Sequence, residues 1–214
     1  DAYKSFVFKK ENLSIGIISA AENGFGCHDY LNNNDYGYAW INHKKIFQEI
    51  QELKKNVNYI VLLAHTGAEN IPIPLYEWRE KYKFYCDLGV DVIISHHPHV
   101  PQGYEEYGKS IIFYSLGNFY FDTCGFEKKQ DDSYSVNINF SKSGISKEII
   151  FHKKQNGILT QTSPLNVNFS IEDLNSYLKP KNYNELHDDY CLKLYEEFYK
   201  FYYQHSMISI EMGF

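Results

Sequence analysis

The alternation of hydrophobic and polar positions near the start of the chain predicts two β-strands joined by a short turn. β-branched and aromatic residues dominate Ser5–Lys9 and Leu13–Ala20, with polar residues between them. The next segment, Glu22–Asp35, is rich in Gly, Asn and Asp, which is typical of a surface loop. We therefore expect a hairpin followed by a loop long enough to carry function.

The middle of the chain alternates between helical and strand periodicity. A helix is expected between an Asn42 cap and Asn56, because apolar residues recur there every three or four positions. Tyr59–Ala64 is a continuous apolar run typical of a buried parallel strand, a second helix ends at Gly89, and Val90–Ile94 is the next buried strand. This order predicts parallel pairing in an α/β sheet, with ligands at the carboxyl ends of the strands.

The second half of the chain reads as further strands followed by a helix. The expected strands are Gly103–Tyr107, Ser110–Ser115, Ser133–Phe140 and Ile145–His152. Their connecting turns favour antiparallel pairing. The segment Tyr183–His205 predicts a polar and aromatic helical tail that docks onto the domain.

Composition and charge narrow the class of protein. Of the 214 residues, 43% are apolar and 22% are charged, which is typical of a globular domain. The net charge of −6 argues against a nucleic-acid partner, because phosphate backbones require clustered Lys and Arg. An acidic protein still binds an anionic substrate when metal ions supply the positive charge. The four cysteines form no C-x-x-C pair, so neither a zinc ribbon nor a redox motif is predicted.

The start of the chain and the length of its apolar runs are the sequence features that concern localisation. No apolar run approaches the roughly 20 residues that a membrane-spanning helix needs. The chain opens on Asp1 and enters a strand pattern directly, so we expect the native sequence to continue upstream. The compartment is therefore left open between the cytoplasm and the cell envelope.

Histidines gather at the ends of the two predicted parallel strands. His65 follows the first strand, and His96, His97 and His99 follow the second. Because the carboxyl ends of adjacent parallel strands meet at one edge of a sheet, these imidazoles are expected to converge. Neutral imidazole is a common ligand of Zn, Mn and Fe. Pro98 is expected to hold His97 in an extended conformation and so to stiffen the turn.

Three ordered motifs carry a resemblance to a known family. His65–Glu69 reads H-T-G-A-E, Ser95–Val100 reads S-H-H-P-H-V, and Tyr114–Asp122 reads Y-S-L-G-N-F-Y-F-D. In these motifs the chain resembles the C-terminal part of the CapA family of poly-γ-glutamate capsule-synthesis proteins, whose fold is similar to calcineurin-like metallophosphoesterases. The resemblance implies a partial metallophosphoesterase-like α/β sandwich with parallel strands, antiparallel C-terminal strands and a helical tail. Its expected boundaries are 1–165 for the C-terminal portion of the domain and 166–214 for the tail.

The resemblance also implies a metal site and its residues. His65 and His97 would be ligands of one divalent ion (Mn, Fe or Zn) and His99 of a second. Two such ions, about 3.5–4 Å apart in the complete protein, would activate water and hold a phosphate-like transition state. Glu69 would orient a histidine or act as general acid or base, or it is a solvated loop carboxylate. Asn118 would contact substrate oxygens or cap a turn.

The chain departs from the family pattern in two ways. Thr66 stands where the family has Trp, and Ser95 where it has Gly. The N-terminal Gly-Asp, Asn-Leu-Glu and Asn-Asn-His motifs, which would supply the remaining ligands, have no counterpart in this sequence. We therefore expect this chain alone to assemble half of a site and to be inactive as a hydrolase. Three histidines without a carboxylate would still hold a single zinc ion.

The function implied is capsule or exopolymer biosynthesis in a bacterium, with hydrolysis of a phosphate ester or of an amide-linked polymer. The expected partners are an anionic polymer or a phosphate-containing small molecule, together with a second copy of the chain or the N-terminal region. The alternative is a non-catalytic assembly or polymer-binding module that retains the fold. An amidohydrolase barrel with its own H-x-H motif is set aside, because such barrels need about 250 residues.

Overall fold

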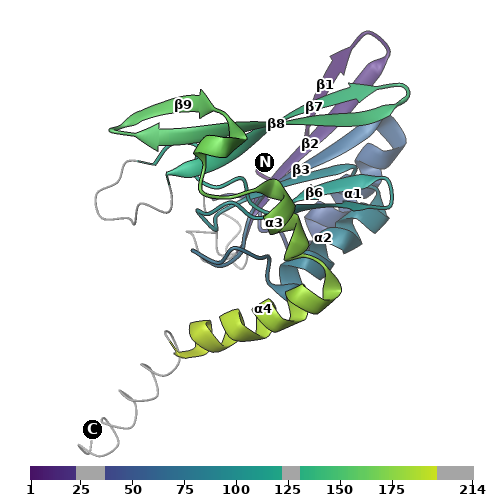
Figure 1. The fold of residues 1–214 in the computed structure, drawn as a ribbon. Helices are drawn as coiled ribbons and strands as arrows, with labels where there is room; N and C mark the ends of the chain where they lie inside the picture. Colours follow the sequence, from purple (N-terminus) through teal and green to yellow (C-terminus); the bar gives the residue numbers. More distant parts are fainter. Residues whose placement is uncertain (23–36, 122–130, 197–214) are drawn as a thin grey trace, which may run out of the picture.

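The computed structural model describes residues 1–22, 37–121 and 131–196 (Figure 1). Its larger sheet has six strands in the order β1-β2-β3-β4-β6-β5. The strands are β1 Phe6–Lys10, β2 Leu13–Ala21, β3 Tyr59–His65, β4 Val92–His96, β5 Tyr104–Tyr107 and β6 Ser110–Phe113. Strands β2, β3, β4 and β6 run parallel, while β1 and β5 lie antiparallel at the two edges. The predicted hairpin and the predicted parallel centre are both confirmed.

The predicted antiparallel half is wrong for one strand. β6 pairs in parallel with β4, with Val92 opposite Ile111, and only its other side pairs antiparallel with β5. All four residues of β6 are buried, which is the pattern of a central parallel strand. The turn after Tyr107 correctly predicted the β5–β6 hairpin. A turn says nothing about the strand on the other side of β6, which is β4.

A second, antiparallel sheet has the order β7-β8-β9. Its strands are β7 Asp132–Ser141, β8 Gly144–Gln155 and β9 Ile158–Thr162. The sequence predicted β7 and β8 but not β9. None of the β9 residues is buried, so the strand lacks the apolar face on which strand prediction depends.

Helices α1 (Lys44–Asn56) and α2 (Tyr76–Leu88) are the two predicted helices. His43, not Asn42, is the N-cap of α1, because its Nδ1 accepts a hydrogen bond from the Lys45 amide at 3.1 Å. α2 ends at Gly89, whose φ of 122° is open to glycine and strained for other residues, as the sequence indicated.

The described elements form three layers, with the larger sheet in the middle (Figure 1). On one face, Ile50 of α1 and Trp78 of α2 pack with Leu62 and Ile93 in one apolar cluster. On the other face, Val92 lies in a second cluster that includes side chains of β7 and β8. The expected α/β sandwich with parallel strands and antiparallel C-terminal strands is therefore confirmed.

The C-terminal segment adds a 3-10 turn at Pro164–Asn166 and the helices α3 (Ile171–Ser176) and α4 (Pro180–Leu194). α4 starts earlier than predicted, since Pro180 occupies its first turn, where proline is favoured. The predicted helix beyond residue 196 lies outside the described residues, and the division at 165/166 stays a prediction. None of the described helices has the length and apolar character needed to cross a membrane.

Candidate metal centre

The predicted site residues lie at the carboxyl edge of the parallel strands. His65 ends β3 and His96 ends β4, and the two are paired in the sheet register. The loop after β3 carries Glu69, and the loop after β4 carries His97 and His99. Adjacent parallel strands therefore bring two segments, more than 25 residues apart in sequence, to one place.

Three side chains form a group that fits a metal ion. Ligand atoms of Glu69, His97 and His99 all lie within 4.8 Å of one another. His65 borders this group, with its ring centroid 5.0 Å from that of His97. The structure thus places Glu69, which the sequence suggested as a catalytic residue, among the donor atoms, and places His65 beside them.

The loop after β4 has a conformation that the sequence did not indicate. His97 has φ of 102° and His99 has φ of 63°, so the predicted extended conformation of His97 is wrong. Left-handed backbone costs about 1–3 kcal/mol at a non-glycine residue and persists where its surroundings hold it. Here the Thr66 amide donates to His96 O at 3.0 Å and the Asn70 amide donates to Pro98 O at 2.9 Å. The two loops therefore fix each other.

Asn118 holds the ring of His99. Nδ1 of His99 lies 2.8 Å from Oδ1 of Asn118. A carbonyl oxygen only accepts, so Nδ1 is the donor in this contact and Nε2 is left as the ring nitrogen that can face a metal. An outer partner of this kind sets the tautomer and orientation of a metal-ligating histidine. Asn118 Nδ2 is buried and has no hydrogen-bond partner among the described residues.

Burial favours the neutral form of two of the site imidazoles, those of His97 and His65. Desolvation, followed by the neighbouring His65, lowers the pKa of His97 to about 4, and Glu69 opposes the shift only in part. Desolvation also lowers the pKa of His65, with His99 adding to it. Neutral imidazoles beside a carboxylate suit Zn, Mn or Fe. The donor set of this chain therefore fits the divalent ion that the motifs predicted.

Comparison with known proteins gives the family of the chain. Residues 1–123 match the family model described as bacterial capsule synthesis protein PGA_cap. The chain belongs to this family. All of the candidate ligands and Asn118 fall inside the matched PGA_cap region.

Two curated relatives agree with the PGA_cap assignment. The chain is 31% identical to the PGA biosynthesis protein CapA of Bacillus subtilis (strain 168) over 148 residues, covering 67% of the chain and 37% of that protein. It is 34% identical to the capsule biosynthesis protein CapA of Bacillus anthracis over 127 residues, covering 58% of the chain and 27% of that protein. The match spans about a third of the length of these relatives.

One solved structure is similar over part of its length. The sulfate thiohydrolase SoxB of Thermus thermophilus, in complex with glycerol, is similar with a TM-score of 0.42 and 15% identity. The similarity covers 82% of this PGA_cap chain and 28% of SoxB.

Glu22 also lies beside the candidate site of this PGA_cap chain, although the sequence did not predict it. Its amide donates to His65 O at 3.0 Å, and its Oε2 accepts from the Gly67 amide at 3.2 Å. Desolvation raises the pKa of Glu22, and the Gly67 hydrogen bond opposes that shift. Only the register of β2 against β3, with Ala21 opposite His65, places Glu22 there. From composition alone, Glu22 is predicted to be the first residue of the Gly-, Asn- and Asp-rich loop that ends at Asp35.

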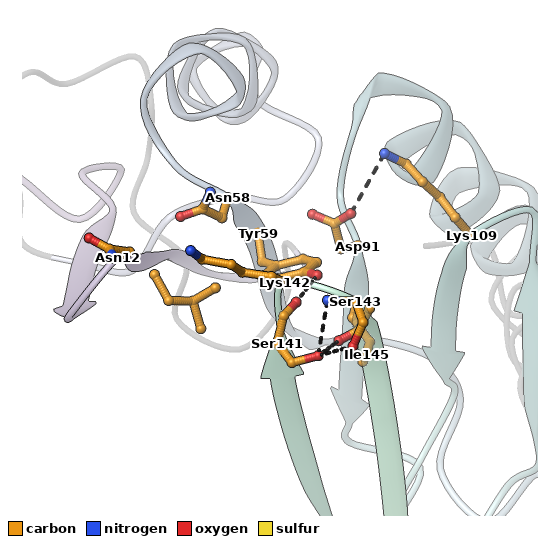
Figure 2. A pocket seen from close by; sticks show the side chains of 11 residues that line it. Asn12, Asn58, Tyr59, Asp91, Lys109, Ser141, Lys142, Ser143 and Ile145 are labelled. Atoms are coloured by element: carbon orange, nitrogen blue, oxygen red, sulfur yellow. Dashed lines mark hydrogen bonds and ion pairs between the residues drawn. The ribbon is translucent and has the colours of Figure 1, made fainter.

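A cavity of about 560 Å³ lies at the amino ends of β3 and β4, whereas the histidines follow their carboxyl ends. Figure 2 shows the side chains that line this cavity. Asn58 and Asp91 line it just before β3 and β4. Their polar atoms serve the fold, since Asp91 Oδ2 accepts from the Ile60 amide and Asn58 Oδ1 accepts from the Ser14 amide. Because ligands of open α/β sheets bind at the carboxyl edge, the histidine group is the better candidate site.

Proposed function

We propose that this chain supplies part of a metal-dependent, hydrolase-type site in capsule or exopolymer biosynthesis. The observation that carries the proposal is the convergence of Glu69, His97 and His99, whose ligand atoms lie within 4.8 Å of one another. Membership of the PGA_cap family supports the biosynthetic setting. The whole protein's activity and substrate are part of the proposal, because the match spans about a third of the curated relatives.

Each residue has a distinct part in the proposed site. His97 and His99 would supply ring nitrogens to the metal, and Glu69 a carboxylate oxygen. His65 lies beside His97 and would be a further ligand. Asn118 orients His99 through Nδ1. When bound, a divalent ion polarises a phosphoryl or carbonyl oxygen and acidifies water. The remaining ligands of a second ion would come from an upstream region that carries the missing motifs.

The proposed substrate is a phosphate ester or an amide-linked polymer. The chain carries a net charge of −6, so an anionic substrate needs a local positive charge at the site. A bound divalent ion would supply that charge beside the loop carboxylate Glu69. The relative from B. subtilis is named for PGA biosynthesis and the one from B. anthracis for capsule biosynthesis, which supports a polymer substrate.

Metal titration tests the proposal directly. Calorimetry of the purified chain with Mn²⁺ and with Zn²⁺ should show binding, and His97→Ala or His99→Ala should weaken it by at least about tenfold. The matched control is His187→Ala, since His187 lies on α4, outside the donor group. Absence of binding by the unaltered chain, or equal affinity in all three variants, would contradict the proposal and favour a non-catalytic polymer-binding module.

A further inference from the structure

Three buried hydroxyl groups, those of Thr66, Tyr82 and Ser95, meet next to the loops that carry the candidate metal ligands. Thr66 Oγ1 lies 2.5 Å from the Tyr82 hydroxyl, and the Tyr82 hydroxyl lies 2.7 Å from Ser95 Oγ. The three residues are 2%, 1% and 0% exposed, so none of these hydroxyls exchanges its partner for solvent. They come from the loop after β3, from α2 and from β4.

The hydroxyl cluster reaches a backbone carbonyl of the second loop. Ser95 Oγ donates to His96 O at 3.4 Å. In the Thr66–Tyr82 and Tyr82–Ser95 contacts either hydroxyl can be the donor. Burial raises the pKa of Tyr82 to about 12, so its proton stays in place at ordinary pH. Hydrogen bonds therefore connect Thr66, through Tyr82 and Ser95, to the carbonyl of His96.

The two outer members of this hydroxyl cluster are next to candidate metal ligands in the sequence. Thr66 follows His65, and Ser95 precedes His96 and His97. The same carbonyl, His96 O, also accepts from the Thr66 amide at 3.0 Å. The Tyr82 side chain of α2 therefore contacts both the loop after β3 and the carboxyl end of β4. These two segments must lie close together for their donor atoms to converge.

The strained backbone explains why such a contact is needed. His97 and His99 both have positive φ, a conformation that a free loop does not favour at these residues. The loops are also in close contact, since a Cβ added to Gly67 would lie 3.2 Å from Pro98 Cγ. A small shift of one loop would therefore move the other. Thr66 and Ser95, one on each side of this contact, both bond to the Tyr82 hydroxyl.

We infer that the Thr66–Tyr82–Ser95 hydroxyl chain positions the two metal-binding loops, with Tyr82 as its central residue. Tyr82 is a positioning residue, because it acts through Thr66 and Ser95 and does not join the donor group. The inference rests on the proposed metal function. It adds a residue on α2 that the motifs do not contain and that fixes the geometry of the site.

Tyr82→Phe against Tyr85→Phe is the matched comparison. Tyr85 is on the same helix, is also buried, and donates its hydroxyl proton to Ile41 O at 2.5 Å, a residue outside both histidine loops. Each variant loses one buried hydroxyl, so both are expected to show similar falls in melting temperature. Only Tyr82→Phe should weaken Co²⁺ and Zn²⁺ binding, by about tenfold, and alter the visible absorption spectrum of the Co²⁺-loaded chain.

A second pair keeps the test decisive if Tyr82→Phe does not fold. Thr66→Ser retains the hydroxyl and should retain the Co²⁺ spectrum, whereas Thr66→Val removes the hydroxyl and should change the spectrum as Tyr82→Phe does. Failure of the unaltered chain to bind metal would overturn the proposed function. Normal binding by the unaltered chain, with the same affinity and Co²⁺ spectrum in Tyr82→Phe, Tyr85→Phe and Thr66→Val, would overturn this inference alone.

Discussion

At the scale of single residues, the candidate site depends on the direction in which each imidazole nitrogen points. His99 offers Nε2 because Nδ1 is engaged by Asn118 Oδ1 at 2.8 Å. A histidine ring without such a partner rotates about its side-chain bonds and loses entropy when it binds a metal. The contribution of Asn118 is therefore to hold the ring of His99 in one orientation before a metal arrives.

Asn118→Ala should lower Zn²⁺ affinity by about 10-fold to 100-fold, as is usual for loss of an outer partner of a metal ligand. Asn118→Asp keeps an oxygen acceptor for Nδ1 and should retain most of the affinity. Competition titration against a chelating dye measures both. Equal affinity in Asn118→Ala and the unaltered chain would show that Asn118 only caps the turn, the other role that its motif left open.

The residue types of the site followed from sequence, but their conformations did not. Strand periodicity placed His65 and the later histidines at the ends of neighbouring parallel strands, and the structure brings them to one edge. The positive φ of His97 and His99 depends on tertiary hydrogen bonds from the facing loop, which local sequence does not encode. Glu22 was missed for the same reason, since its place follows from register.

At the scale of elements, the second sheet supports the loop that carries Asn118. The Phe119 ring lies 5.2 Å from the ring of His152 on β8, and Lys154 Nζ donates to Phe121 O at 2.5 Å. His152 is 8% exposed and its Nε2 lies 2.7 Å from Ser135 Oγ on β7. Sequence reasoning found β7 and β8 through their apolar positions, but it did not show that their polar side chains reach this loop.

The burial of His152 predicts part of the pH dependence of stability. Desolvation lowers its pKa below 6.5, so the folded state resists a proton that the unfolded state accepts. Its contribution is therefore fully present above about pH 6.5 and is lost as pH falls toward the folded pKa. Chemical denaturation at pH 7.5 and pH 5 should show a smaller loss of stability in His152→Gln than in the unaltered chain. A loss of the same size in both would rule out this role for His152, and His187→Gln controls for removal of an imidazole elsewhere.

At the scale of the whole molecule, the end strand β1 exposes apolar side chains to solvent. β1 is an end strand of the six-stranded sheet, and all five of its residues are exposed. Phe6 is 64% exposed and Phe8 is 48% exposed. End strands with exposed apolar side chains favour pairing with another strand. This arrangement agrees with the expectation that a second copy or an upstream region covers the edge, which stays a prediction.

Self-association through β1 is therefore the expected behaviour of the isolated chain. Multi-angle light scattering over a range of concentrations should show reversible growth in mass, and Phe6→Lys with Phe8→Lys should suppress it by placing charge on the edge. Leu165→Lys is the control, because Leu165 is 91% exposed but lies in a 3-10 turn outside both sheets. An added fragment carrying the Gly-Asp, Asn-Leu-Glu and Asn-Asn-His motifs should compete with self-association and raise the melting temperature. A monomer at every concentration, unaffected by the fragment, would show that residues 1–214 form a self-sufficient domain and that β1 needs no partner.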